Sequence, residues 1–314
     1  MYYFLLVPMI MGFATESLLW KRNKLKPLAS LIGNATWRFV FVFSVFMVFF
    51  AINGTEVFDN LTLEVLGFTL LLHVFGVSAV MLMVKIMQNM CVSIVEPLSL
   101  FRIIPLTILS WLIFGGNLSP WEFVLVALIF VFCASLGFFQ RRHESNLKKA
   151  CCTPALDGSI EKVDGPVGDF NKGLIYMALW TLCAVTMDLI INHMSHTGVH
   201  PITFSALRAI TFLGVAFLVF MIFKRGNRKE TLVKAVKNKI MIMIGAIFAL
   251  HSILFITLLL NVDNVGILAA IGVTSVPLVV LCGTLLMKER IKWYSYIFIG
   301  LIVACVIILT IYQI

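Results

Sequence analysis

The chain has 314 residues, of which 61% are hydrophobic and 12% are charged, and its formal net charge is +9 at pH 7. Soluble globular proteins are about 45–50% apolar, so this composition excludes a soluble globular protein and indicates an integral membrane protein. The net positive charge alone would suit a nucleic-acid-binding protein, but the places where the charge lies along the chain argue against that partner.

Ten segments are long and apolar enough to cross a bilayer core, which takes about 20 helical residues. We predict an all-α fold with transmembrane helices near 2–20, 32–52, 62–84, 91–114, 120–140, 172–193, 202–223, 240–260, 265–287 and 292–312. The first segment lacks a preceding basic region and a small-residue cleavage site, so we expect a retained helix rather than a secretory signal. Pro97 and Pro105 in the fourth segment and Pro277 in the ninth are expected bending points.

The basic residues indicate an orientation in the membrane. Of the 24 Lys and Arg residues, three lie inside spans and the other 21 lie in alternate connections. The opposite connections carry no Lys or Arg, and their charged residues are all acidic: Glu56, Asp59, Glu64, Glu122 and Asp263. The positive-inside rule therefore predicts a multi-pass protein of the cell (plasma) membrane, with cytoplasmic basic loops and both termini outside. These charges then serve orientation in the lipid bilayer, and no nucleic-acid partner is expected.

The seven cysteines show no spacing typical of a metal site. Five of them lie in predicted spans as small hydrophobic residues, and Cys151 and Cys152 lie in a connection predicted to face the reducing cytoplasm. We therefore expect neither a disulfide nor a bound metal.

The polar stretch 141–171, with Pro154, Pro166 and three glycines, divides the chain into halves at 1–140 and 172–314. The halves share features in the same order. "GFTLLLH" (67–73) matches "GAIFALH" (245–251), and in each half a proline is followed by a tryptophan sixteen residues later (Pro105 and Trp121, Pro277 and Trp293). An arginine lies early in each second helix (Arg38, Arg208), and an acid lies near the end of each first helix (Glu16, Asp188). Duplication of a five-helix unit is the best interpretation.

An odd number of helices in each copy inverts the second copy in the membrane. Inverted repeats are common in secondary transporters, in which the binding site lies near the midplane between the repeats. Because inversion leaves midplane positions at the midplane, His73 and His251 are expected at one depth. The fold class predicted is thus ten transmembrane helices as two inverted-topology five-helix repeats.

Four charges near the helix ends are candidates for gating. Glu16 and Arg38 lie toward the cytoplasmic side and could pair, and Asp188 and Arg208 lie in mirrored positions toward the outer side. One hypothesis is that these are two latches, which open and close as a carrier alternates. The alternative is a static role, in which each pair links its helices or each arginine extends to the interface.

A second group lies deeper and is the candidate substrate site. It comprises His73, Glu96, Arg102, Tyr176, Trp180 and His251. A histidine can bind or relay a proton, and an aromatic ring attracts a cationic or stacked substrate. The alternatives are a structural hydrogen bond for each histidine and plain packing for the aromatic residues. Arg102 is expected to be the only deep cation that is always charged.

The second half resembles a known family in "HPITFSALRAITFLGVAFLVF" (200–220) and in "NVGILAAIGVTSVPLVVLCGTLLMKERIKWYSYIFIGLIVACVIIL" (264–309). The family is the EamA-like branch of the drug/metabolite transporter superfamily. The first half matches more loosely and has Asn117 where its repeat partner is Glu289. The resemblance implies a carrier of small metabolites, amino acids, quaternary amines or nucleotide sugars. It also implies no bound cofactor and a cavity lined by helices 1, 3, 4, 6, 8 and 9 of the ten.

The function predicted is secondary transport of a small polar or zwitterionic metabolite, amino-acid-like or an amine, by alternating access. Proton coupling through Glu96 or a histidine is a further hypothesis. Glu289 is expected to order a tight turn or to pair with a loop cation, without contact to the substrate. A flippase for a lipid or polyprenyl phosphate is the main alternative, with a cavity open to lipid and lined by basic residues. An enzyme acting on lipid-linked substrates and a non-transporting receptor are less favoured, because the chain has neither clustered acids nor a large soluble domain.

Overall fold

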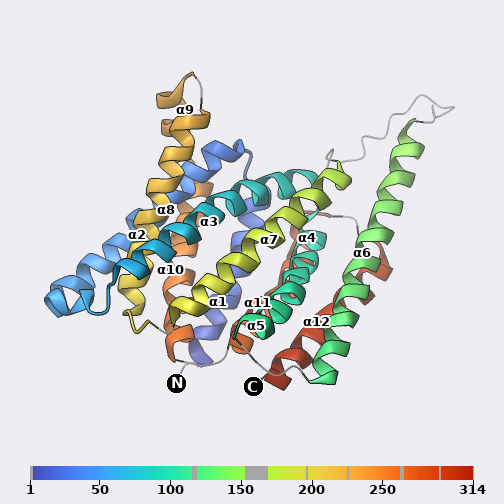
Figure 1. The fold of residues 1–314 in the computed structure, drawn as a ribbon. Helices are drawn as coiled ribbons and strands as arrows, with labels where there is room; N and C mark the ends of the chain where they lie inside the picture. The colour runs from blue at the N-terminus through green and yellow to red at the C-terminus, as the bar shows by residue number, and fades with distance from the viewer. Residues whose placement is uncertain are drawn as a thin grey trace.

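The computed structural model describes residues 3–114, 119–152, 169–195, 197–224, 226–261, 265–289 and 291–313. These residues form helices and no strand. The helices are α1 (Tyr3–Arg22), α2 (Pro27–Asn53), η1 (Gly54–Phe58), α3 (Leu63–Asn89), α4 (Val92–Ser99), η2 (Leu100–Arg102), α5 (Ile103–Phe114), α6 (Pro120–Cys152), α7 (Phe170–Ser195), α8 (Pro201–Phe223), α9 (Arg228–Val236), α10 (Lys239–Asn261), α11 (Val265–Leu286) and α12 (Trp293–Gln313). Figure 1 shows α1 beginning and α12 ending at one end of the bundle, with α9 at the opposite end.

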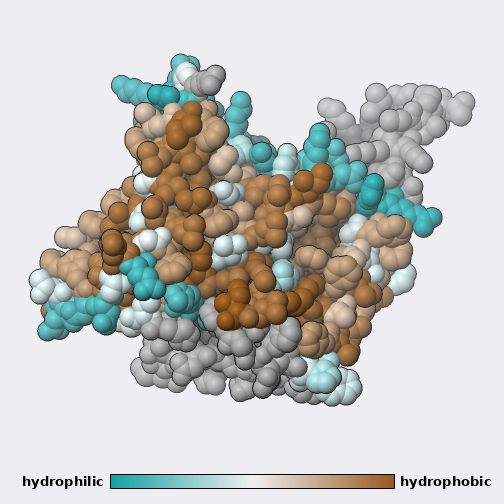
Figure 2. All heavy atoms as spheres, in the orientation of Figure 1, coloured by the Kyte–Doolittle hydropathy of each residue, from teal (hydrophilic) through white to brown (hydrophobic). Residues whose placement is uncertain are grey.

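Six helical stretches of the described chain are long and apolar enough to cross a membrane. They are Pro27–Phe58, Leu63–Asn89, Val92–Leu109, Pro120–Arg142, Phe170–Met194 and Pro201–Phe223, and three shorter apolar helices lie at Lys239–Leu254, Ser275–Leu286 and Trp293–Ile308. Large apolar side chains such as Ile52, Leu182 and Leu285 are exposed on the outside of the bundle. Apolar surface covers much of the visible face, while hydrophilic residues gather near α9 (Figure 2). Such a large exposed apolar surface suits lipid, so the chain is a multi-pass membrane protein.

The fourth predicted segment is not one continuous helix. It consists of α4 and α5 joined by the 3₁₀ turn η2, which carries Arg102. Pro105 has no backbone N–H, so it cannot pair with the carbonyl of Phe101, and the α-helical ladder is interrupted there. The bend expected from the prolines is therefore found as a break between Pro97 and Pro105.

The linker predicted at 141–171 is shorter than expected. Helix α6 continues to Cys152, and α7 already begins at Phe170. The stretch after Gln140 is rich in good helix formers and has no glycine or proline before Pro154, so nothing ends the helix at 141. Residues 153–168 of the linker lie outside the described residues, as do Asn117 and Asp263.

Small residues allow α2 to pack closely against α9 and α10. A Cβ atom added at Gly33 would lie 2.9 Å from the Met241 side chain, and one added at Gly245 would lie 2.5 Å from Trp37 Cβ. The Trp37 indole donates a hydrogen bond of 2.8 Å to the carbonyl oxygen of Val236 at the end of α9. These contacts fix α2 relative to α10, and α2 in turn carries Arg38.

The two halves of the chain are interleaved. Helix α3 packs along α7, and α1 packs along α10. Helix α2 contacts both α8 and α10, and α8 also contacts α3. Helix α1 meets α11, α7 meets α5 and η2, and α6 packs along α12. The largest buried apolar cluster lies between the halves and includes Ile94, Val279 and Ile302.

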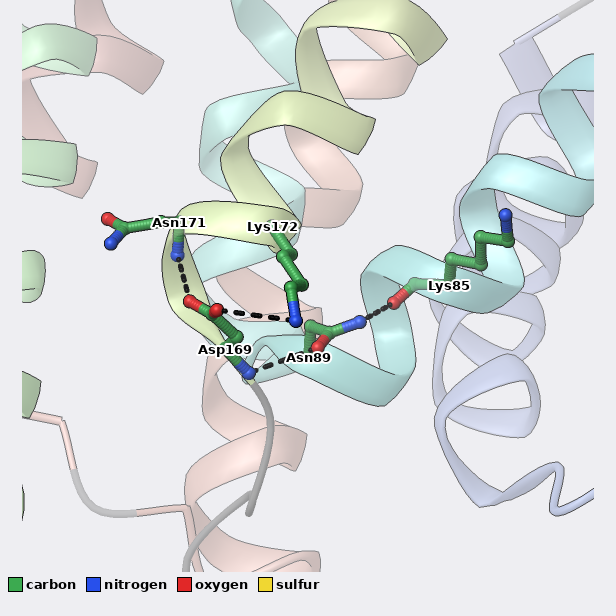
Figure 3. A network of polar contacts seen from close by, with 5 residues as sticks. All are labelled: Lys85, Asn89, Asp169, Asn171 and Lys172. Carbon is green, nitrogen blue, oxygen red and sulfur yellow. Dashed lines mark hydrogen bonds and ion pairs between the residues drawn. The ribbon is translucent and has the colours of Figure 1, made fainter.

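Polar contacts join the end of α3 to the start of α7 (Figure 3). The Asn89 side chain accepts a hydrogen bond of 3.0 Å from the Asp169 backbone N–H and donates one of 2.7 Å to the Lys85 carbonyl. The Asp169 carboxylate accepts a hydrogen bond from the Asn171 N–H and lies 3.7 Å from Lys172 Nζ. These bonds satisfy backbone donors at the start of α7 and connect the two halves at that end of the bundle.

Candidate functional site

A cavity of about 270 Å³ lies inside the bundle, between the two halves of the chain. Residues of α1, α2, α3, α4, η2, α7, α8, α10 and α11 line it. Nine of the ten predicted site residues are among them: Glu16, Arg38, His73, Glu96, Arg102, Trp180, Asp188, Arg208 and His251. Residues far apart in sequence and chosen as candidates for two separate roles thus lie around one buried space.

Tyr176 is the predicted site residue that does not line the cavity. It lies one turn before Trp180 on α7, nearer the start of that helix. Its ring instead has Lys85 Nζ 5.0 Å from its centroid, which is a cation–π contact with the end of α3. Tyr176 therefore shares a helix face with Trp180 but lies beyond the end of the cavity, where α3 packs against α7.

Arg102 and Asp188 bring η2 and α7 together. Arg102 Nη1 lies 3.8 Å from Asp188 Oδ2, and its guanidinium carbon lies 5.8 Å from the centroid of the Trp180 ring. The break between α4 and α5 places Arg102 on a turn that faces α7. The cavity wall here combines a cation, a carboxylate and an aromatic face.

Glu16 and His251 connect α1 to α10. His251 Nδ1 lies 3.8 Å from Glu16 Oε2, and Glu16 Oε1 accepts a hydrogen bond of 3.0 Å from the Trp20 indole. The Phe13 ring meets the His251 ring edge to face, with centroids 3.7 Å apart. Glu16 is therefore held by partners on α1 and α10.

The expected pairs Glu16–Arg38 and Asp188–Arg208 are not formed among the described side chains. The two carboxylates have His251 and Arg102 as their ion contacts instead. The guanidinium carbon of Arg38 lies 4.1 Å from the centroid of the Phe248 ring, so this arginine is stacked on α10. The four charges were expected toward opposite sides of the membrane, but they line one cavity, and rotation about each helix axis decides which groups meet.

The expectation that Arg102 is the only deep permanent cation is wrong. Arg38 and Arg208 line the same cavity and are almost fully buried. Three arginines therefore face three carboxylates, those of Glu16, Glu96 and Asp188, around the cavity. The site is close to neutral in total charge, with its charges at separate positions on the wall.

The His73 ring has a defined hydrogen-bond arrangement. Its Nδ1 lies 2.7 Å from the Thr69 carbonyl oxygen and 2.8 Å from Thr211 Oγ1. A carbonyl can only accept, so Nδ1 donates and carries the proton of the neutral ring. The structural hydrogen bond considered for this histidine is thus present, while His73 Nε2 has no hydrogen-bond partner among the described residues.

Glu96 lies on α4 and completes the polar lining. The Ser17 side chain on α1 hydrogen-bonds to its carboxylate. Its Oε1 is buried and has no hydrogen-bond partner among the described residues. A carboxylate in this state can accept a further hydrogen bond from a molecule in the cavity.

The sequence analysis missed several residues of the wall. Phe212 lies one turn after Arg208, Phe248 lies three residues before His251, and Ser17 follows Glu16 directly. The sequence signal for each of these three residues was its position within one helical turn of a predicted site residue. Glu289 was expected to order a tight turn or to pair with a loop cation, but its carboxylate instead accepts hydrogen bonds from Val92 N–H and Ser93 N–H at the start of α4.

The described residues contain no group of three His, Cys, Asp or Glu side chains placed to hold a metal ion. A buried, mainly apolar cavity with a few polar groups at defined positions is typical of small-molecule sites. Within a bundle of apolar helices, charged residues facing such a cavity mark a pathway or a binding site for a polar solute. These features are typical of a membrane transporter.

Comparison with known proteins finds a family match in the second half of the chain. Residues 171–311 match the EamA-like transporter family, which confirms the resemblance to the EamA branch of the drug/metabolite transporter superfamily for the second half of the chain. A solved structure titled "Crystal structure of protein" has the same fold, with a TM-score of 0.54 and 11% identity over 99% of this chain and 97% of that one. A search of curated proteins gives no match.

Proposed function

We propose that the chain is a secondary transporter that moves a small polar or zwitterionic, amino-acid-like metabolite by alternating access. The observation that carries the proposal is the cavity between the halves, which nine polar or aromatic side chains from eight helical segments line. Its volume of about 270 Å³ suits a small metabolite rather than a large headgroup. Cations, carboxylates and an aromatic face around one space suit a ligand that carries both charges.

The helix contacts support ten crossings arranged as two inverted five-helix repeats, 1–140 and 172–314. Exchanging α1 with α7, α2 with α8, α3 with α10, the α4–α5 pair with α11, and α6 with α12 maps the main helix contacts onto one another. The α3–α7 contact becomes α10–α1, the α2–α10 contact becomes α8–α3, and α2–α8 and α6–α12 map onto themselves. A two-fold relation of this kind is the basis of alternating access in carriers with inverted repeats.

The ion contacts suggest how alternation proceeds. In this conformation Glu16 contacts His251 and Asp188 contacts Arg102. Arg38 and Arg208 line the same cavity and are the other cations that these carboxylates can reach after a helix rotation. The geometry therefore suits a gating role in which these four residues exchange ion partners between the two states of the carrier.

The positive-inside rule places the end of the bundle with α9 in the cytoplasm and both termini outside. This orientation agrees with the common end at which α1 begins and α12 ends in Figure 1. Proton coupling is proposed through Glu96 or a cavity histidine, because these are the cavity groups that can change charge and still face a solute.

The proposal is tested by uptake into proteoliposomes containing the purified full chain. A pool of amino acids and amines is supplied outside, with and without an imposed pH gradient, and the internal contents are identified by mass spectrometry. Trp180→Ala is the site variant, and Trp293→Ala is its matched control, because the Trp293 side chain is 72% exposed on α12. We expect uptake of one or a few compounds by the native chain and the Trp293 variant and a loss of at least tenfold in the Trp180 variant.

Three results would contradict parts of the proposal. Uptake of no compound by the native chain would contradict transport of this substrate class. Equal uptake in both tryptophan variants would exclude the cavity as the binding site. Uptake without any response to the pH gradient would remove proton coupling and leave the carrier function intact.

A further inference from the structure

Two buried arginines in the cavity wall have donor groups without partners. Arg38 on α2 is 3% exposed and Arg208 on α8 is 5% exposed. Among the described residues, Arg38 Nε and Nη2 and Arg208 Nε make no hydrogen bond. A buried N–H donor without an acceptor is destabilising unless another group satisfies it. The positions of these donors therefore indicate an anionic partner that is not part of the chain.

Two of the three carboxylates of the cavity are engaged elsewhere. Asp188 contacts Arg102, and Glu16 contacts His251 and the Trp20 indole. Arg38 and Arg208 are therefore the cations of the wall that are open to a ligand in this conformation.

Aromatic rings hold the Arg38 guanidinium in place. Its carbon lies 4.1 Å from the centroid of the Phe248 ring and 5.1 Å from that of the Phe212 ring. Stacking on rings restricts a guanidinium without using its N–H donors, so the donors remain available in a fixed fork that matches an oxyanion. The Arg208 guanidinium has an aromatic contact of its own, because its carbon lies 5.8 Å from the centroid of the Phe204 ring.

An acceptor lies beside these donors. The centroid of the His73 ring is 5.6 Å from that of Phe212, and His73 Nδ1 donates to the Thr69 carbonyl. In the neutral ring, His73 Nε2 is consequently an acceptor, and it has no partner among the described residues. A ligand that fits this corner carries an oxyanion for the arginines and an N–H or O–H donor close to it.

We infer that Arg38 and Arg208 form an anion subsite that binds the carboxylate of an amino-acid-like substrate, with His73 Nε2 accepting a hydrogen bond from the neighbouring substrate donor. This inference rests on the proposed function and narrows its substrate class. Simple amines lack the group that the subsite binds. Glu96, with a buried Oε1 that no described residue satisfies, is the carboxylate that the substrate ammonium group faces.

The test measures thermal unfolding of the purified full chain in detergent at constant ionic strength. The probes are an equimolar pool of the twenty standard L-amino acids, a pool of the corresponding amino-acid amides, and inorganic phosphate. We expect the amino-acid pool to raise the melting temperature by about 2–4 °C and the amide pool to leave it unchanged. A shift with phosphate alone would show an oxyanion site of another kind and overturn the carboxylate assignment. Equal shifts with amino acids and amides would overturn the subsite, and so would no shift with any probe.

Variants separate a ligand-binding arginine from a structural one. Arg38→Gln and Arg208→Gln are expected to abolish the rise in melting temperature that the amino-acid pool causes. Without ligand, each variant is expected to unfold at the melting temperature of the native chain or above it, because the substitution removes a buried charge with unsatisfied donors. A structural arginine would instead lower that temperature and leave the shift intact, which would overturn the subsite. Arg38→Lys keeps the charge without the fork and is expected to reduce the shift at least twofold. Arg142→Gln, at an exposed arginine on α6, is the matched control and is expected to keep it.

The same variants distinguish failure of the subsite from failure of the proposed function. Amino-acid binding without uptake into proteoliposomes would overturn the carrier function and leave the subsite intact. Uptake of amino acids at the native rate by Arg38→Gln and Arg208→Gln would overturn the subsite and leave the carrier function intact.

Discussion

Glu289, three residues after the end of α11, accepts hydrogen bonds of 2.9 Å from Val92 N–H and 3.0 Å from Ser93 N–H at the start of α4. Its Oε2 also accepts one of 2.6 Å from Ser93 Oγ. A carboxylate at a helix N-terminus satisfies backbone donors and interacts favourably with the helix dipole. This side chain of the second half therefore fixes the first turn of a cavity-lining helix of the first half.

Replacing Glu289 by alanine is expected to lower the free energy of unfolding by about 1–2 kcal/mol, because the donors at the start of α4 lose their acceptor. Glu289→Gln keeps one acceptor oxygen and is expected to lose less. Denaturant titration of the purified protein measures both. The control is Glu56→Ala at an exposed site in η1, and an equal loss there would contradict the assignment.

Glu16 and His251 are expected to be energetically coupled, because their side chains are buried and lie 3.8 Å apart. A double-mutant cycle with Glu16→Gln and His251→Gln measures this coupling from melting curves. We expect an interaction free energy of about 0.5–3 kcal/mol. Strict additivity would show that the contact between α1 and α10 contributes nothing to stability.

Asp188→Asn is expected to destabilise the protein by about 1–3 kcal/mol, because it leaves Arg102 without its carboxylate partner in the cavity wall. The double variant Asp188→Asn with Arg102→Gln removes both charges and is expected to recover at least half of that loss. Thermal unfolding of the two variants side by side is the measurement. A double variant less stable than Asp188→Asn would show that Arg102 has a stronger partner than Asp188.

Gly245→Ala is expected to destabilise the protein by about 1–3 kcal/mol through overpacking. The added Cβ would lie 2.5 Å from Trp37 Cβ and 3.0 Å from the Arg38 backbone nitrogen, so α2 and α10 must separate. Gly214→Ala on α8 is the matched control, since a Cβ there meets nothing within 4 Å. The control is expected to be neutral or slightly stabilising, and equal losses at both positions would rule out the packing explanation.

The helices and the ring of cavity residues were predictable from the sequence because both depend on one-dimensional patterns. Apolar length gives the segments, and a buried charge in a span needs a protein or aqueous partner. Glu16, Arg38 and Asp188 were therefore identified as charges that need a partner, without knowledge of their neighbours. The inverted repeat remains a prediction, which the exchange of helix contacts supports.

The pairing of the charges could not be predicted, because it depends on helix rotation and on contacts between distant segments. Glu16 contacts His251 on α10 rather than Arg38, whose guanidinium stacks on Phe248. Tyr176 shares a face with Trp180, but the cavity ends between them, and no local pattern marks that boundary. For the 3₁₀ turn at Arg102, the sequence indicated only a bend, through the prolines at 97 and 105 on either side of it.

The turn η2 divides one crossing of the bundle into two short rods, α4 and α5. Glu289 fixes the start of α4, whereas α5 is joined to α4 only through the three residues of η2, which are wound more tightly than an α-helix. A rotation of α5 about η2 would displace Arg102 relative to Asp188 and leave α4 in place. One side of the cavity could then open without disturbing the wall that α4 provides.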